Sequence, residues 1–329
     1  MPSTSPADRR EPQNILRAAA WMALALASFT LLAVAGRKVT ALFAAADGRT
    51  TPDFGDTFQL MFFRSVIALV IMVLVIAMSR EGWAQVRSRK LGLHGVRNVI
   101  HFLGQFSWFH ALSLIPLAQL FAIEFTNPIW VALFAPLLLG ERMSRLRALA
   151  VVLGFAGILI IVQPGGAPLN LGHALALTAA ISFAGSMIAT RQLMATDTGA
   201  GFLFHMAWMQ LPIALVLAAP YLRLPGLELS IWLLVLGLGA LLAHFALAKA
   251  FATAEAIVVA PMDFLRLPLI ALIGVFVYDE ALGWSVLLGG AIVIAANAIN
   301  LLAERQSALA RRAAQAATPG GRPQSSPGE

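Results

Sequence analysis

Long apolar segments follow one another along nearly the whole chain, and polar residues gather in the short stretches between them. A helix that crosses a bilayer needs roughly 20 apolar residues. The apolar segments predict membrane-spanning helices at residues 15–36, 57–79, 93–113, 116–139, 145–163, 170–192, 200–219, 229–249, 255–278 and 283–303. We therefore expect an all-α membrane protein of about ten transmembrane helices.

The composition agrees with a lipid environment. Of the 329 residues, 59% are hydrophobic and 12% are charged, and the mean hydropathy is +0.81. A soluble fold could not bury so much apolar surface. The net charge of +7 does not indicate a nucleic-acid partner, because the basic residues form no patch beside a soluble fold. The sequence contains no cysteine, which excludes disulfides, thiolate metal sites and cysteine nucleophiles.

The distribution of Lys and Arg predicts the orientation in the membrane. An N-terminus in the cytoplasm puts 17 of the 23 basic residues on the cytoplasmic side, as the positive-inside rule requires. An even number of helices returns the C-terminus to that side. Residues 1–14 and 304–329 are polar, so we expect a cytoplasmic N-terminal tail and a disordered cytoplasmic C-terminal tail. A cleaved signal peptide is the alternative for the first apolar segment, which is longer than a signal peptide needs.

The two halves of the chain resemble each other at an offset of 139 residues. The matching pairs include Glu124 with Asp263, Phe125 with Phe264, Ala132 with Ala271 and Glu141 with Glu280. Because this offset carries five helices, an odd number, the second copy has to be inverted in the membrane. We predict two inverted five-helix repeats at residues 15–163 and 170–303. Inverted repeats are typical of alternating-access carriers.

Few ionisable residues lie within the predicted helices. Each costs about 2.5–3.5 kcal/mol at the bilayer centre on insertion scales, so each is a functional candidate. The candidates are Arg64, His101, His110, Glu124, His205, His244, Asp263 and Arg266. Among the histidines, we interpret His110, His205 and His244 as packing residues rather than ligands.

One predicted helix, 93–113, carries a polar stripe. Arg97, His101, Gln105 and Trp108 recur at spacings of four, four and three residues, which places them on one helical face. This pattern favours the wall of a water-accessible cavity, where His101 and Gln105 donate to a substrate and Trp108 offers an aromatic surface. The alternative is interhelical hydrogen bonding that fixes the bundle.

Prolines interrupt two predicted helices at corresponding places in the two halves. Glu124 precedes Pro128, and Asp263 precedes Pro268. A proline removes a backbone donor and frees a carbonyl, so both helices are expected to bend near their middles. Interrupted helices at matching positions point to the binding site of a transporter.

The charges near these prolines have a structural alternative. Asp263 and Arg266 stand three residues apart and can neutralise each other as an ion pair. For Arg64, we expect a pair with Glu124 or Asp263 rather than a substrate carboxylate.

Other features indicate architecture rather than chemistry. Glu141 and Glu280 lie at helix ends, where a carboxylate interacts favourably with the next helix dipole. Gly157 and Gly289 favour close approach of two helices. The chain has no phosphate-binding GxxxxGK[ST] motif, so it carries no ATP motor of its own.

Three sequence motifs resemble the EamA domains of the drug/metabolite transporter superfamily. They are Pro116-Leu117-Ala118-Gln119, the segment Glu124-Phe125-Thr126-Asn127-Pro128 and the turn Gly140-Glu141-Arg142, with a degenerate second copy that ends in VYDEALGWSVLLGGAIVIAANAI. The resemblance implies two inverted five-helix repeats, a central cavity built by the first four helices of each half, and the fifth and tenth helices behind it. The second copy departs from the pattern at Asp279, which stands where the first has Gly140.

From these observations we expect a secondary transporter of the bacterial inner membrane that exports small metabolites by alternating access. The chain is similar to the YddG-type exporters, so neutral or aromatic amino acids are the first expected solutes. The expected substrate-binding residues are Arg64, His101, Gln105, Trp108, Glu124, Asn127, Asp263 and Arg266. We expect no catalytic residue, metal or cofactor, and a monomer, with a homodimer as the alternative.

Two other functions compete with amino-acid export. One is a broad exporter of drugs or lipophilic cations, with Glu124 or Asp263 as the counter-charge. The other is an intramembrane enzyme, which would need a clustered nucleophile or metal set that the sequence does not reveal.

Overall fold

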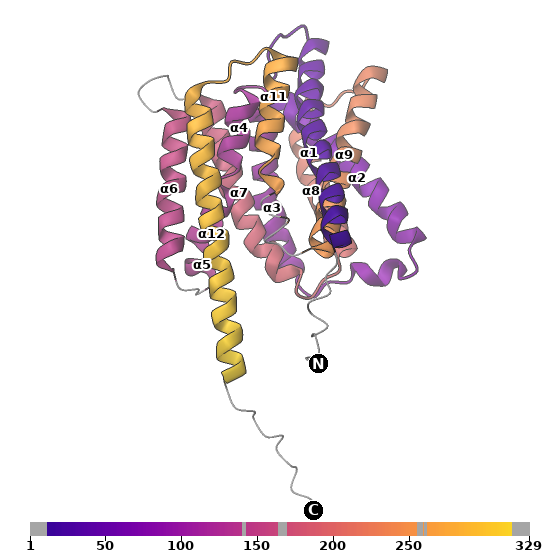
Figure 1. Cartoon of the computed structure of the whole chain (residues 1–329). Coiled ribbons are helices and arrows are strands. Elements are labelled where there is room, and N and C mark those ends of the chain that lie inside the picture. The colour runs from indigo at the N-terminus through magenta and orange to yellow at the C-terminus, as the bar shows by residue number, and fades with distance from the viewer. Residues whose placement is uncertain (1–11, 140–142, 164–169, 255–258, 260–261, 318–329) are drawn as a thin grey trace, which may run out of the picture.

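The computed structural model describes residues 12–139, 143–163, 170–254, 259 and 262–317. All regular structure within these ranges is helical (Figure 1). The α-helices are α1 (Pro12–Ala46), α2 (Phe54–Met78), α3 (Leu91–Ala111), α4 (Leu117–Glu124), α5 (Asn127–Leu139), α6 (Arg145–Val162), α7 (Leu171–Leu193), α8 (Gly199–Ala218), α9 (Leu227–Thr253), α11 (Arg266–Tyr278) and α12 (Trp284–Ala317). Short 3-10 helices span Gly82–Val86 and Ala219–Tyr221.

Eight segments of the described chain are long and apolar enough to cross a membrane. One of them, Leu117–Leu138, consists of the consecutive helices α4 and α5. Two more helices run through the same bundle: α3, which buries a polar face, and α11, which has 13 residues. The predicted all-α membrane fold of about ten helices is confirmed.

Polar side chains fix where several helices begin. Asp53, Ser144, Asn170 and Thr198 each accept a hydrogen bond from the backbone N–H three residues further on. These bonds satisfy donors that the first helical turn leaves free. Four helices, α2, α6, α7 and α8, are thereby joined to their preceding loops at a defined residue.

The terminal helices extend beyond their predicted ends. Helix α1 begins at Pro12, inside the predicted tail 1–14. Helix α12 continues to Ala317, so the prediction of a disordered tail from residue 304 is wrong as far as 317. The added stretch is rich in Ala, Arg and Gln, which are strong helix formers. Residues 318–329 lie outside the described residues.

Pairs of helices follow a twofold pattern when the predicted spans are numbered from one to ten. Spans one and eight pack together as α1 and α9, and spans three and six as α3 and α7. If each span is replaced by the span five places along the chain, spans one and eight become spans six and three. The first pair is thereby converted into the second. The same exchange leaves the pairs α2–α8 and α6–α12 unchanged. Two five-helix halves related by a twofold axis have this property.

Helices α6 and α12 approach closely through glycine. A Cβ atom on Gly157 would lie 2.9 Å from the carbonyl oxygen of Gly289, and a Cβ on Gly289 would lie 2.7 Å from that of Gly157. The predicted close approach is confirmed. Of the two glutamates assigned to helix ends, Glu141 lies outside the described residues.

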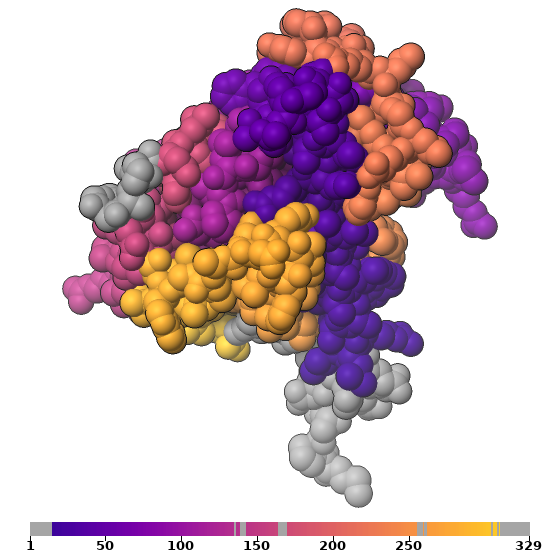
Figure 2. All heavy atoms as spheres, turned by 90° about the horizontal axis from the view of Figure 1, so that it is seen from above, coloured from indigo at the N-terminus to yellow at the C-terminus, as the bar shows by residue number. Residues whose placement is uncertain are grey.

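The first residues of α1 and the last residues of α12 lie at the same end of the bundle, here named the termini end (Figure 1). The opposite end is named the far end. Viewed from there, α1 lies between α9 and the pair formed by α11 and α12 (Figure 2). Helix α1 therefore contacts helices of the second half along its length.

Candidate functional site

A cavity of about 410 Å³ lies inside the bundle. Its walls come from α1 to α5, α7 to α9 and α11. Aromatic rings dominate these walls: Phe29, Trp108, Phe109, Phe121, Phe125, Phe183 and Phe202. The lining extends along α3 from Trp108 and Phe109, near the C-terminal end of that helix, to Arg97 near its start at the termini end, where Thr190 and Phe202 also line the cavity. The volume is that of a typical pocket for a small metabolite, roughly 300–1,000 Å³.

All eight residues that the sequence suggested for substrate binding line this one cavity. They are Arg64, His101, Gln105, Trp108, Glu124, Asn127, Asp263 and Arg266. The structure thus brings together side chains from α2, α3, α4, α5, α11 and the segment before α11.

The stripe on α3 faces the cavity along more than two helical turns. Arg97, His101, Gln105 and Trp108 all contribute to its wall. They also bond to neighbouring helices: Gln105 accepts from Arg64, and Trp108 Nε1 donates to Glu124 Oε2 at 2.7 Å. The two interpretations of the stripe therefore coexist, because the same residues border the cavity and tie the bundle together.

Glu124 and Asp263 share one arginine. Arg266 Nη2 lies 3.4 Å from Glu124 Oε1 and 3.3 Å from Asp263 Oδ2. The guanidinium also lies over the rings of Phe29 and Phe125, at 4.7 and 4.9 Å from their centres. The predicted pair of Asp263 with Arg266 is confirmed, and Glu124 joins it from the other half of the chain.

The prediction for Arg64 was wrong. Its Nη2 donates to Gln105 Oε1 at 2.7 Å and to Gln210 Oε1 at 3.2 Å, and neither Glu124 nor Asp263 lies within ion-pair distance. Gln210 on α8 escaped the sequence analysis, because a single amide in an apolar helix gives no signal of its partner. Amide oxygens take the place of the expected carboxylate.

The predicted interruption of the fourth span is confirmed. It lies a few residues before Pro128. Helix α4 ends at Glu124, and α5 begins at Asn127 with Pro128 as its second residue. A proline in the first helical turn lacks only an N–H that would have no helical partner there. Helix α11 begins in the same manner, with Pro268 as its third residue. The two interruptions meet, since the ring centres of Phe125 and Phe264 are 5.7 Å apart.

A network around Arg37 ties several elements together at the far end of the bundle. Arg37 Nε donates to the carbonyl of Leu112 at 2.6 Å, and its Nη2 to that of Ile115 at 2.9 Å. Its Nη1 pairs with Glu280, which also accepts from the N–H of Leu117 at 2.8 Å. These bonds join α1 to the loop after α3, the start of α4 and the loop before α12. Nothing in the sequence pattern assigns Arg37 to a site.

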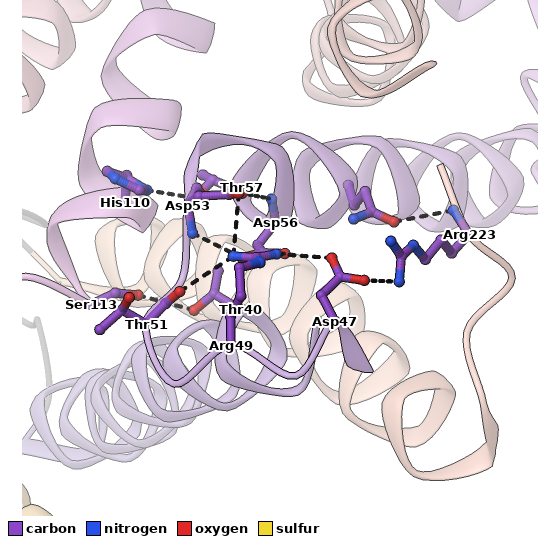
Figure 3. A network of polar contacts seen from close by, with 11 residues as sticks. Thr40, Asp47, Arg49, Thr51, Asp53, Asp56, Thr57, His110, Ser113 and Arg223 are labelled. Atoms are coloured by element: carbon purple, nitrogen blue, oxygen red, sulfur yellow. Dashed lines mark hydrogen bonds and ion pairs between the residues drawn. The ribbon is translucent and has the colours of Figure 1, made fainter. Parts of the chain in front are cut away.

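A second polar network holds the loop between α1 and α2 (Figure 3). Arg49 bonds to both carboxylate oxygens of Asp56, at 2.8 and 2.9 Å, and to Asp47 at 3.0 Å. Hydrogen bonding to Asp56 is the main cause that raises the pKa of Arg49. Arg223 reaches Asp47 from the loop before α9. These contacts explain why so many charges lie in one short loop, and none of the residues lines the cavity.

Two of the three histidines interpreted as packing residues bond within the bundle away from the cavity. His110 Nδ1 lies 2.9 Å from Thr57 Oγ1, and His205 Nε2 lies 2.8 Å from the carbonyl of Val86. His244 bonds to the carbonyl of Ala240 at 2.7 Å but also lines the cavity, which the sequence analysis did not foresee. Phe183 and Phe202 were missed too, because isolated Phe residues are common in apolar helices.

Comparison with known proteins agrees with this architecture. The model of the EamA-like transporter family matches residues 16–163. The riboflavin transporter of Brucella anthropi is 31% identical over 242 residues, which cover 72% of this chain and 84% of that protein. The riboflavin transporter of Rhizobium johnstonii is 30% identical over 289 residues, covering 87% and 91%. The S-adenosylmethionine uptake transporter of Rickettsia bellii is 26% identical over 251 residues, covering 76% and 86%.

A solved crystal structure, described only as that of a protein, shares the fold. Its TM-score is 0.52 at 20% sequence identity, and the match covers 86% of this chain and 98% of that one. With the cavity, the paired halves and the relatives taken together, the chain is a multi-pass membrane transporter. It belongs to the EamA family of the drug/metabolite transporter superfamily.

Proposed function

We propose that this transporter moves a ring-bearing metabolite of neutral or negative charge across the bacterial inner membrane by alternating access, with riboflavin as the first candidate. The observation that carries the proposal is the lining of the cavity. Its aromatic rings offer stacking surfaces to a planar solute, and its polar groups can bond to the edges of that solute. Relatives named as riboflavin transporters support the choice of first candidate.

The charges in the cavity argue against a cationic solute. Three guanidinium groups, those of Arg64, Arg97 and Arg266, face two carboxylates, those of Glu124 and Asp263. The formal excess is positive, and both carboxylates already share Arg266. A lipophilic cation would meet net repulsion in this low-dielectric space. The same positive excess disfavours S-adenosylmethionine, which carries a sulfonium cation.

An aromatic amino acid, the solute first expected from the sequence, is the second candidate. One observation favours it: Asp263 Oδ1 and Asn127 Oδ1 are buried acceptors without a partner among the described residues. Both residues line the cavity. An ammonium group of the solute would satisfy these oxygens while its ring stacks on the aromatic wall.

The closed far end supports alternating access. With both termini in the cytoplasm, the cavity lies toward the cytoplasm and the Arg37 network seals the periplasmic side. Transport then requires that network to open while the termini end closes. The twofold relation of the halves provides two such states by exchanging their roles.

Counterflow in proteoliposomes tests the proposal. Vesicles loaded with unlabelled riboflavin should accumulate external radiolabelled riboflavin transiently, whichever direction the cell uses. Tryptophan and tetraphenylphosphonium serve as competitors, and protein-free vesicles as the control. Counterflow of radiolabelled tryptophan in tryptophan-loaded vesicles, without riboflavin counterflow, would replace the first candidate with the second. Riboflavin counterflow that is inhibited by tetraphenylphosphonium but not by excess unlabelled riboflavin or by tryptophan would contradict the proposal.

A further inference from the structure

Two arginines in the cavity differ from Arg266 in their surroundings. Arg64 on α2 and Arg97 on α3 are 6% and 5% exposed, and both line the cavity. Among the described residues, neither has a carboxylate within the 4.0 Å limit of an ion pair. Arg266, by comparison, has two. A buried cation without a counter-charge is costly, so its presence inside a membrane protein needs a reason.

Neutral oxygens are the acceptors of both arginines. Arg97 Nε donates to Thr190 Oγ1 at 3.2 Å, and its Nη1 donates to Asn98 Oδ1 at 3.1 Å. Its guanidinium also lies 4.6 Å from the centre of the Phe202 ring. For Arg64, the acceptors are two amide oxygens, while its buried Nε–H has no partner among the described residues. Donors therefore remain after the protein's own acceptors are used.

The hydrogen bonds that the two arginines donate fix the orientation of the side-chain amides beside them. Arginine can only donate, so the oxygen of Gln210 has to face Arg64 and its NH₂ has to face the other way. That NH₂ lies 3.1 Å from Nδ1 of His101 and 3.3 Å from Oδ1 of Asn98, and it donates to both. Nδ1 of His101 is thus an acceptor, and the neutral ring carries its proton on Nε2.

This side of the cavity consequently offers donors. The oxygens of Gln105 and Gln210 accept from Arg64, and the oxygen of Asn98 accepts from Arg97 and from the NH₂ of Gln210. Arg64, Arg97 and Gln105, which line the cavity, therefore present positive charge and N–H groups to a solute. The partnerless acceptor Asp263 Oδ1 belongs to the residue that pairs with Arg266, and Asn127 Oδ1 is a second partnerless acceptor among the lining residues.

We propose that Arg64 and Arg97 form a subsite for an anionic group, a carboxylate or a phosphate, of the transported solute. The inference rests on the proposed function of the same cavity and adds a charge preference and an orientation. The anionic group bonds to these guanidinium groups, which charge-assisted hydrogen bonding favours. The ring of the solute stacks on the aromatic wall, and its donors point toward Asp263.

Matched solute pairs test this subsite in purified protein reconstituted into nanodiscs. Flavin mononucleotide differs from riboflavin by one phosphate, and indole-3-propionate differs from tryptamine in the sign of its charge. We expect the anionic member of each pair to bind at least about tenfold more tightly, measured by fluorescence titration. Arg97→Gln should reduce that ratio to about one, whereas Arg97→Lys should retain part of it. Arg80→Gln, an exposed loop arginine, is the control and should keep the wild-type ratio.

The outcomes separate the two proposals. If indole-3-propionate is preferred over tryptamine but neither flavin binds, the subsite stands and the riboflavin candidate fails. If riboflavin is transported and both pairs bind equally, the proposed function stands and the subsite is overturned. Arg64→Gln provides a second variant, and a melting curve of each variant shows whether it is folded. A folded Arg97→Gln that keeps the wild-type preference overturns the inference.

Discussion

Arg37 and Glu280 form an ion pair between α1 and the loop before α12, 243 residues apart in the chain. Each also bonds to the backbone at the start of α4. Arg37 donates to the carbonyl of Ile115, and Glu280 accepts from the N–H of Leu117. Tyr278 lies beneath the guanidinium, its ring centre 4.7 Å away. One pair thus joins both halves of the transporter at the end of the bundle that lies beyond the cavity.

Glu280→Gln is expected to loosen this closure. The substitution keeps the shape of the side chain but removes the charge, and a hydrogen bond to a charged group contributes about 1.5–3 kcal/mol. The chain has no cysteine, so Ala118→Cys on α4, which is 6% exposed, can serve as the only thiol. Labelling of that thiol by a membrane-impermeant maleimide should increase several-fold in the Glu280→Gln background. Equal labelling in both backgrounds would argue against a gate at this pair.

Glu124→Gln is expected to lower transport by about tenfold or more, because it removes one of the two counter-charges of Arg266 inside the cavity. The amide oxygen can still accept from Trp108, so the bundle should remain folded. Glu228→Gln is the matched control, since Glu228 is 63% exposed and pairs only with Lys38 among the described residues. Counterflow at the wild-type rate in Glu124→Gln would remove this residue from the transport site.

Gly157→Ala should destabilise the contact between α6 and α12. The added methyl group would stand 2.7 Å from Val293 Cγ2 and 2.9 Å from a backbone oxygen, so the helices have to separate. Overpacking of this kind costs about 1–3 kcal/mol. Gly185→Ala is the control, because its nearest neighbour would be Ile100 at 3.6 Å. The melting temperature should fall by several degrees for Gly157→Ala and stay unchanged or rise for the control.

Asp197, in the loop between α7 and α8, gives a pH dependence outside the membrane-spanning segments. Burial acts most strongly on its pKa and raises it, but hydrogen bonds from Ser88, His94 and Thr196 outweigh burial and leave the pKa lowered. A carboxyl group whose folded pKa lies below its unfolded value of about 3.9 stabilises the fold above that pH. The contribution is lost as the pH falls through the folded value.

Asp197→Asn should therefore melt at a lower temperature than the wild type at neutral pH, and the difference should shrink below about pH 4. Thermal unfolding followed by tryptophan fluorescence over this range measures it. A difference that is the same at acid and neutral pH would show that the charge of Asp197 makes no contribution.

The sequence predicted the members of the cavity better than their partners. Helical spacing is local, so the stripe from Arg97 to Trp108 could be assigned to one face before the neighbours of α3 were known. The partner of Arg64 could not be assigned, because it depends on how α2 packs against α8. Arg37 and Glu280 likewise lie in different halves, and the local pattern assigned only Glu280, to a helix end.

The bounds of the helices show a similar division. Apolar length predicted where the spans lie within the described part of the chain, since the bilayer sets that length; the start of the span predicted at 255–278 falls outside the described residues. It did not predict that α12 continues to Ala317, because helix formation outside the membrane depends on residue propensity rather than on hydropathy. The early end of α4 at Glu124 depends on local bonds, such as that from Thr126 Oγ1 to the carbonyl of Ile123.

The central claim is that the buried charges border a wet pathway which the solute occupies. Ser186→Cys tests it most directly, because this residue lines the cavity and the chain offers no other thiol. A hydrophilic maleimide should label the cysteine in inside-out vesicles, and riboflavin or tryptophan should slow the labelling. Ala176→Cys, fully buried and away from the cavity, should stay unlabelled throughout. If Ser186→Cys is as unreactive as Ala176→Cys in vesicles of either orientation, the pathway does not run through this cavity.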